Sequence, residues 1–123
     1  MRKILVIDDE PDFCFFVKEN LELTGNYTVI TAFTGEEGIA SALKERPDLI
    51  LLDLLMPKVD GAKVYRELDA HEATTSIPVI MLTAIDPESA REQVPGLPKE
   101  AFLTKPVLLA VLKAAIEHAL KKR

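Results

Sequence analysis

Short apolar runs recur along the chain at regular intervals. Four of them are continuous, which is typical of strands that are buried on both faces of a parallel sheet. The second run in chain order alternates between apolar and polar residues and therefore resembles a strand nearer the edge of a sheet. The pattern predicts strands over residues 4–7, 27–31, 49–52, 79–82 and 101–103.

Helical patterns separate these strands, and their start signals are clear. A proline in a first turn, a hydroxyl or carboxylate cap, and apolar residues three or four positions apart all mark helices. We expect the first helix to end at Gly25, and we expect Glu37 to complete a capping box with the residue that opens the second. The signals open helices at Pro11, Thr34, Asp60 and Asp86, and an apolar stripe between residues 108 and 120 marks the last one.

Strand and helix patterns alternate five times along the chain. This order predicts an α/β fold in which a five-stranded parallel sheet carries five helices on its two faces. The length of 123 residues suits one domain over residues 1–123. Ligands of such folds bind outside the carboxyl ends of the strands.

Composition narrows the possible functions. The net charge of -5 argues against nucleic acid binding by this domain, because phosphate contacts need clustered lysine and arginine. No apolar run reaches the roughly 20 residues of a membrane span, and the N-terminus lacks the pattern of a signal peptide. The single cysteine, Cys14, lies in an apolar helical stretch and cannot form an internal disulfide. We therefore expect a cytoplasmic protein without membrane contacts, in which this thiol is packed and inert.

Distinctive polar residues follow four of the five predicted strands. They are Asp8 and Asp9 after the first, Asp53 after the third, Thr83 after the fourth and Lys105 after the fifth. Carboxylates gathered at one edge repel each other, so they either raise a pKa or bind a cation. Oxygen ligands without histidine or cysteine favour Mg²⁺. The sequence therefore predicts a magnesium site at this edge.

The same residues suit phosphoryl transfer, which depends on positioning and on charge neutralisation. Asp53 is the best nucleophile because it ends a central, wholly apolar strand, and its product would be an aspartyl phosphate. Lys105 can pair with a phosphoryl oxygen, and the Thr83 hydroxyl can donate a hydrogen bond to another. Each of these polar residues alone could be a helix cap, a loop acid, a strand-end hydroxyl or a solvated lysine. Their joint placement at one edge of the sheet favours a functional site over these separate structural roles.

The motifs that carry these residues resemble the receiver domains of response regulators in two-component signalling. The resemblance covers essentially the whole chain, and the full set of motifs, in order and suitably spaced, is specific. The motifs are Ile7-Asp8-Asp9-Glu10, Asp53-Leu54-Leu55-Met56-Pro57 with Asp60-Gly61, Thr83-Ala84 and Lys105-Pro106.

The resemblance implies a flavodoxin-like, doubly wound fold with strand order 2-1-3-4-5 and a cis Lys105–Pro106 bond. It also implies phosphorylation of Asp53 by a histidine kinase or a histidine phosphotransfer protein, followed by a conformational switch that controls an output partner. In the same way it implies Mg²⁺ ligation by Asp8, Asp9, Asp53 and the backbone carbonyl of Leu55, and a switch pair formed by Thr83 and Phe102.

Two departures from the family pattern concern the surface that meets an output partner and the lifetime of the phosphorylated form. Pro95 and Pro98 should end the fourth helix near Gln93, and this helix belongs to a surface with which receivers often meet partners. The change is either a harmless loop variation or an altered output face. Leu55 and Ile85 are apolar where some relatives have polar groups, so we predict a long-lived phosphorylated form.

Other functions fit the sequence less well. A phosphotransferase or phosphatase with an aspartyl phosphate intermediate would need an acid two residues after the nucleophile, and Leu55 occupies that position. Nucleotide- or flavin-binding folds would need a glycine-rich loop that is absent. The remaining alternative is a receiver-like scaffold that binds partners without phosphorylation. We expect a signalling domain, not a dedicated enzyme, that is a monomer or a weak dimer and either stands alone or belongs to a longer regulator.

Overall fold

The sheet of the computed structural model, which describes residues 1–56 and 60–121, has five parallel strands in the order β2-β1-β3-β4-β5. Both the predicted fold class and the predicted strand order are therefore confirmed. The strands are β1 (Arg2–Ile7), β2 (Tyr27–Ala32), β3 (Leu49–Asp53), β4 (Val79–Thr83) and β5 (Phe102–Thr104). The helices are α1 (Pro11–Glu22), α2 (Gly35–Glu45), α3 (Gly61–Ala70), α4 (Pro87–Gln93) and α5 (Leu109–Lys121), with a 3₁₀ turn, η1 (Lys99–Ala101), before β5.

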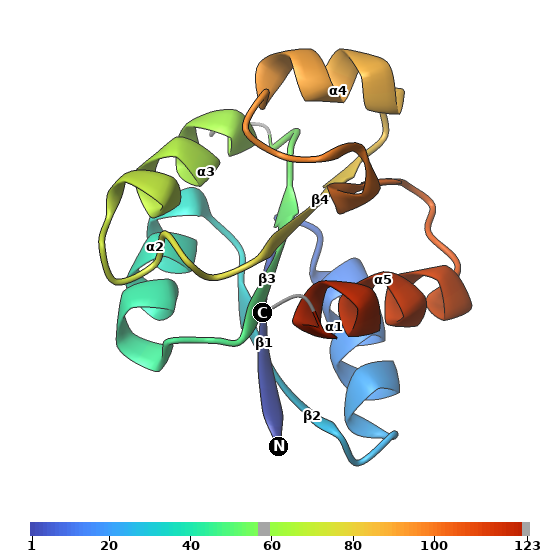
Figure 1. The fold of residues 1–123 in the computed structure, drawn as a ribbon. Helices are drawn as coiled ribbons and strands as arrows, with labels where there is room; N and C mark the ends of the chain where they lie inside the picture. Colours follow the sequence, from blue (N-terminus) through green and yellow to red (C-terminus); the bar gives the residue numbers. More distant parts are fainter. Residues whose placement is uncertain (57–59, 122–123) are drawn as a thin grey trace.

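Helices cover both faces of the sheet, and this explains the continuous apolar runs. Figure 1 shows α2 and α3 on one side of the sheet and α1 and α5 on the other. In β1, Leu5 and Ile7 pack with the side chains of α2, α3 and α4, whereas Ile4 and Val6 pack with those of α1 and α5. Because successive side chains of a strand point to opposite faces, a strand with two covered faces needs apolar residues throughout.

Three of the predicted helix caps form as expected. The side chains of Thr34, Asp60 and Asp86 accept backbone hydrogen bonds at the starts of α2, α3 and α4. The return bond of the capping box differs, because the Glu37 carboxylate accepts from the backbone N–H of Phe33 at 3.2 Å and not from that of Thr34. This contact still satisfies a donor just before the helix.

The predicted end of the fourth helix is confirmed, whereas the first helix ends earlier than predicted. The first helix ends at Glu22, three residues before the predicted stop, and Gly25 lies in the following turn with a φ of +79°. That left-handed conformation favours glycine. The fourth helix ends at Gln93, as the prolines predicted. None of the helices in the described part of the chain is long and apolar enough to cross a membrane.

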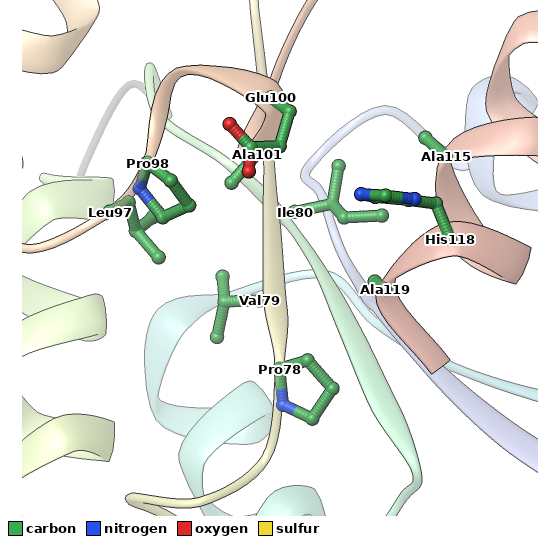
Figure 2. Close-up of a pocket in the computed structure, with 10 residues that line it drawn as sticks. All are labelled: Pro78, Val79, Ile80, Leu97, Pro98, Glu100, Ala101, Ala115, His118 and Ala119. Carbon is green, nitrogen blue, oxygen red and sulfur yellow. The ribbon is translucent and has the colours of Figure 1, made fainter. Parts of the chain in front are cut away.

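The segment after α4 packs against the sheet and leaves a hollow of about 190 Å³ beside α5. Figure 2 shows Leu97 and Pro98 on one side of this hollow and Ala115 and Ala119 of α5 on the other. Its walls are mainly apolar, and small alanine side chains leave the space open. This hollow lies between the segment after α4 and helix α5, and an altered output face stays a prediction.

Candidate functional site

The structure brings three of the predicted site residues into contact at the carboxyl edge of the sheet. Asp8 follows β1, Asp53 ends β3 and Lys105 follows β5. The Lys105 Nζ atom lies 2.6 Å from Asp8 Oδ2 and 3.7 Å from Asp53 Oδ2. Parallel strands end at the same edge, so residues almost a hundred positions apart in sequence meet there.

Lys105 is the positive centre of this group of acids. Its side chain is only 14% exposed, and its ammonium group donates to Asp8 and, at 2.7 Å, to Glu10 Oε1. Burial alone would lower the pKa of Lys105, but the hydrogen bonds to these two carboxylates and the charge of Asp53 raise it above its ordinary value. Lys105 is therefore a permanent cation at neutral pH.

Carboxylate oxygens of Asp8, Glu10 and Asp53 lie within 4.8 Å of one another. Burial, followed by the charge of Asp8, raises the pKa of Asp53 to about 6. Burial also raises the pKa of Asp8, although bonds to Lys105 and to the backbone of Glu10 oppose the shift. Buried acids that repel each other gain from a second cation, and an oxygen-only donor set suits a hard ion such as Mg²⁺. The residues present therefore fit a magnesium ion.

The acidic group differs in one member from the predicted ligand set. Glu10 belongs to the group and Asp9 does not, among the residues that the structure describes. Glu10 occupies the N-cap position of α1 without a capping bond from its side chain, which instead pairs with Lys105. Asp9 acts on the site through its charge, which raises the pKa of Asp53. Direct ligation by Asp9 stays a prediction.

Backbone groups hold the two buried aspartates in place. Asp53 Oδ1 accepts from the N–H of Leu55 at 3.1 Å, and Asp8 Oδ1 accepts from the N–H of Glu10 at 3.0 Å. The Cys14 thiol donates to the backbone carbonyl of Asp8 at 3.4 Å. Cys14 is packed in the core, as predicted, and burial raises the pKa of its thiol to about 12, which favours an inert thiol.

Gly61 allows the start of α3 to approach the end of β3 closely. Its N–H donates to the carbonyl of Leu54 at 3.0 Å. A Cβ atom at this position would lie 2.6 Å from the Cα of Leu54 and would clash with the backbone carbonyl of Asp53. Only glycine fits without moving the backbone that carries the Asp53 side chain. Pro57, the proline of the same motif, lies outside the described residues.

Thr83 and Phe102, the predicted switch pair, lie on adjacent strands. Thr83 is fully buried, and its hydroxyl oxygen accepts from the N–H of Ile85 at 3.1 Å. Phe102 is also buried and pairs with Met81 in the register of β4 and β5. The backbone N–H of Lys105 donates to the Thr83 carbonyl at 2.8 Å, which joins the ends of these strands. The switch role stays a prediction, while the cis Lys105–Pro106 bond is confirmed.

An aromatic contact at the site was not predicted from the sequence. Phe13, near the start of α1, lies with its ring against the ammonium of Lys105, 4.5 Å from ring centroid to Nζ. A hollow of about 540 Å³ opens beside this contact and is lined by Phe13, Phe16, Lys105 and Val107 among others. In the sequence, Phe13 is one apolar residue among several in its helix, and nothing local connects it to Lys105.

Comparisons with known proteins agree with this geometry. A family model described as "Response regulator receiver domain" matches residues 4–117. The DNA-binding dual master transcriptional regulator RpaA of Synechocystis is 40% identical over 124 residues, which cover 99% of this chain and 50% of RpaA. PilH of Pseudomonas aeruginosa is 36% identical over 87% of this chain and 88% of its own length. The chain spans about half the length of the first curated relatives that it matches.

One solved receiver domain has a similar three-dimensional fold. It is the receiver domain of the sensor histidine kinase PA1611 from Pseudomonas aeruginosa, which has a magnesium ion coordinated in its active site cleft. The two folds match with a TM-score of 0.85 over 98% of each chain at 29% identity.

Proposed function

Because the chain belongs to the response regulator receiver family, we propose that it accepts a phosphoryl group on Asp53 and switches conformation in response. The donor is a histidine kinase or a histidine phosphotransfer protein. The observation that carries this proposal is the position of Asp53, a buried carboxylate at the end of a central strand that faces both Lys105 and Asp8. A signalling domain of this kind assists its own phosphorylation without being a dedicated enzyme.

The transfer step needs an ionised Asp53 and a fixed positive charge beside it. One Asp53 oxygen attacks the phosphorus atom, and the new P–O bond forms as the bond between phosphorus and the imidazole nitrogen of the donor breaks. The bonding electrons leave with that nitrogen. With a pKa of about 6, Asp53 is mostly ionised at neutral pH and can act as the nucleophile. Lys105 pairs with one phosphoryl oxygen, and the Thr83 hydroxyl donates to another.

Mg²⁺ is the metal that we assign to this site. Asp8, Asp9 and Asp53 would hold it through carboxylate oxygens, with the backbone carbonyl of Leu55 as a further ligand. The raised pKa values of Asp8 and Asp53 support a cation here, and the receiver domain of PA1611 binds magnesium in its own cleft. When bound, Mg²⁺ supplies positive charge that neutralises phosphoryl oxygens during transfer.

The response to phosphorylation passes through Thr83 and Phe102. The Thr83 hydroxyl moves toward the phosphoryl group, and the Phe102 ring follows on the neighbouring strand, so that the surface of α4, β5 and α5 changes for an output partner. We place the domain, residues 1–123, in the cytoplasm as a monomer or weak dimer. Its net charge of -5 does not favour direct binding to nucleic acid.

The proposal is tested by intact mass spectrometry after incubation with acetyl phosphate, with and without Mg²⁺. We expect one phosphoryl adduct that needs Mg²⁺ and is lost in Asp53→Asn. Asp60→Asn is the matched control, because it removes a nearby carboxylate while asparagine still caps α3. If a folded, Mg²⁺-saturated wild-type protein takes no phosphoryl group from either acetyl phosphate or a histidine kinase, the domain is a phosphorylation-independent scaffold.

A further inference from the structure

The contact between Phe13 and Lys105 joins the first helix to the loop after the last strand. The Nζ atom of Lys105 lies 4.5 Å from the ring centroid of Phe13, within the range of a cation–π interaction. The ring is half-buried and belongs to the first turn of α1, whose backbone is fixed by the hydrogen bond from Cys14 N to the carbonyl of Glu10. A rigid aromatic face is therefore set against the cation of the site.

The surroundings of the ammonium group explain what this ring contributes. Lys105 donates to Asp8 and Glu10, and Asp53 lies slightly farther away. Glu10 is 62% exposed, so it holds the cation less firmly than a buried partner would. The hollow of about 540 Å³ is lined by Lys105, Glu10 and Phe13, and the Phe13 ring lies directly against the ammonium group. The ring therefore covers part of the ammonium group at the edge of this hollow.

We propose that Phe13 is a positioning residue for Lys105 and holds its ammonium beside Asp8 and Asp53, where it meets the incoming phosphoryl group. This inference rests on the proposed function, because it concerns the rate at which Asp53 is phosphorylated. The negative face of the ring attracts the cation, and its bulk excludes water, so Lys105 keeps one position while its carboxylate partners change. Leucine would fill much of the same space but would not attract the cation.

The expected effect on rate follows from the usual strength of a partly exposed cation–π contact. Phe13→Leu should slow phosphorylation by acetyl phosphate, at saturating Mg²⁺, by about two- to tenfold. Phe13→Tyr keeps the ring and should stay within about twofold of the wild type. Phe16→Leu is the matched control on the same helix, because Phe16 lines the same hollow while the ring over Lys105 is that of Phe13. It should also stay within about twofold.

A double-mutant cycle tests the contact without any phosphorylation. The unfolding equilibrium in urea is measured in Mg²⁺-free buffer for the wild type, Phe13→Leu, Lys105→Met and the double variant. We expect Phe13→Leu to lower the folding constant about two- to fivefold more when Lys105 is present than when methionine replaces it. A purely structural role of Phe13 would give equal losses in both backgrounds.

The outcomes separate this inference from the proposed function. Equal losses of stability in the lysine and methionine backgrounds would refute the contact, and a tyrosine variant as slow as the leucine variant would refute the role of the ring. An unchanged phosphorylation rate in Phe13→Leu would refute the positioning role. Failure of the wild type to take any phosphoryl group would refute the proposed function and the rate effect with it, while the cycle would still report on the contact.

Discussion

Asp53→Asn should stabilise the metal-free protein at neutral pH. The wild-type protein buries the Asp53 carboxylate to 4% exposure beside the negative charge of Asp8. Asparagine has nearly the same shape and can still accept the hydrogen bond from the N–H of Leu55, but it carries no charge. The substitution therefore removes an electrostatic cost that the folded state carries.

The size of the effect follows from the pKa of Asp53. Its ordinary value is 3.8, and the folded protein raises it to about 6. Because the folded state binds this proton more tightly than the unfolded state, stability is greatest at low pH and falls as the pH rises through this interval. The difference of about two pH units corresponds to roughly 3 kcal/mol of unfolding free energy above pH 6. Local relaxation reduces the gain, so we expect about 1–3 kcal/mol at pH 7.

Urea denaturation in EDTA at pH 4 and pH 7 measures this difference. The gain of Asp53→Asn over the wild type should be present at pH 7 and much smaller at pH 4, where the folded wild type binds the proton and the unfolded state binds it in part. Asp12→Asn, an exposed carboxylate on the first turn of α1, is the control and should show little change at pH 7. A loss of stability in Asp53→Asn at pH 7, or a gain of equal size at both pH values, would refute the argument.

Three further predictions concern the metal, the backbone and the lifetime of the phosphorylated form. Millimolar Mg²⁺ should raise the melting temperature of the wild type, and Asp8→Asn should remove most of that rise, as read by calorimetry with and without EDTA. Gly61→Ala should cost roughly 1–3 kcal/mol in urea denaturation, because its methyl group would clash with the backbone at Leu54; an unchanged midpoint would contradict the packing described. Leu55→Asn should speed the loss of the phosphoryl group, since asparagine can orient a water that leucine cannot; an unchanged half-life by intact mass would contradict this.

The fold was largely predictable because its signals are local. Each strand of this sheet needs an apolar run, and α1 to α4 each have a cap or a proline at their start. The order and type of the elements could therefore be assigned without knowing any tertiary contact. The fifth strand was predicted one residue too early, since it runs over Phe102–Thr104 and not over residues 101–103. The N–H of Ala101 donates to the carbonyl of Pro98 in the 3₁₀ turn before the strand. That bond depends on how this loop closes, which apolar periodicity does not record.

The sequence predicted most residues of the site but not the side-chain contacts among them. Asp8, Asp53 and Lys105 could be brought together because strand ends of a parallel sheet share one edge. The parts played by Glu10 and Phe13 depend on the angle at which α1 leaves the first strand, because this angle points their side chains toward a lysine more than ninety residues away. Sequence spacing within one helix carries no information about that approach.

The most direct test of the account is to locate the modified residue in wild-type protein. After reaction with acetyl phosphate and Mg²⁺, the acyl phosphate is reduced with borohydride and the protein is digested and mapped by tandem mass spectrometry. The account predicts a single reduced side chain, at Asp53, and none when Mg²⁺ is replaced by EDTA. Modification at Asp8, Asp9 or Glu10 in place of Asp53, or equal modification without Mg²⁺, would contradict it.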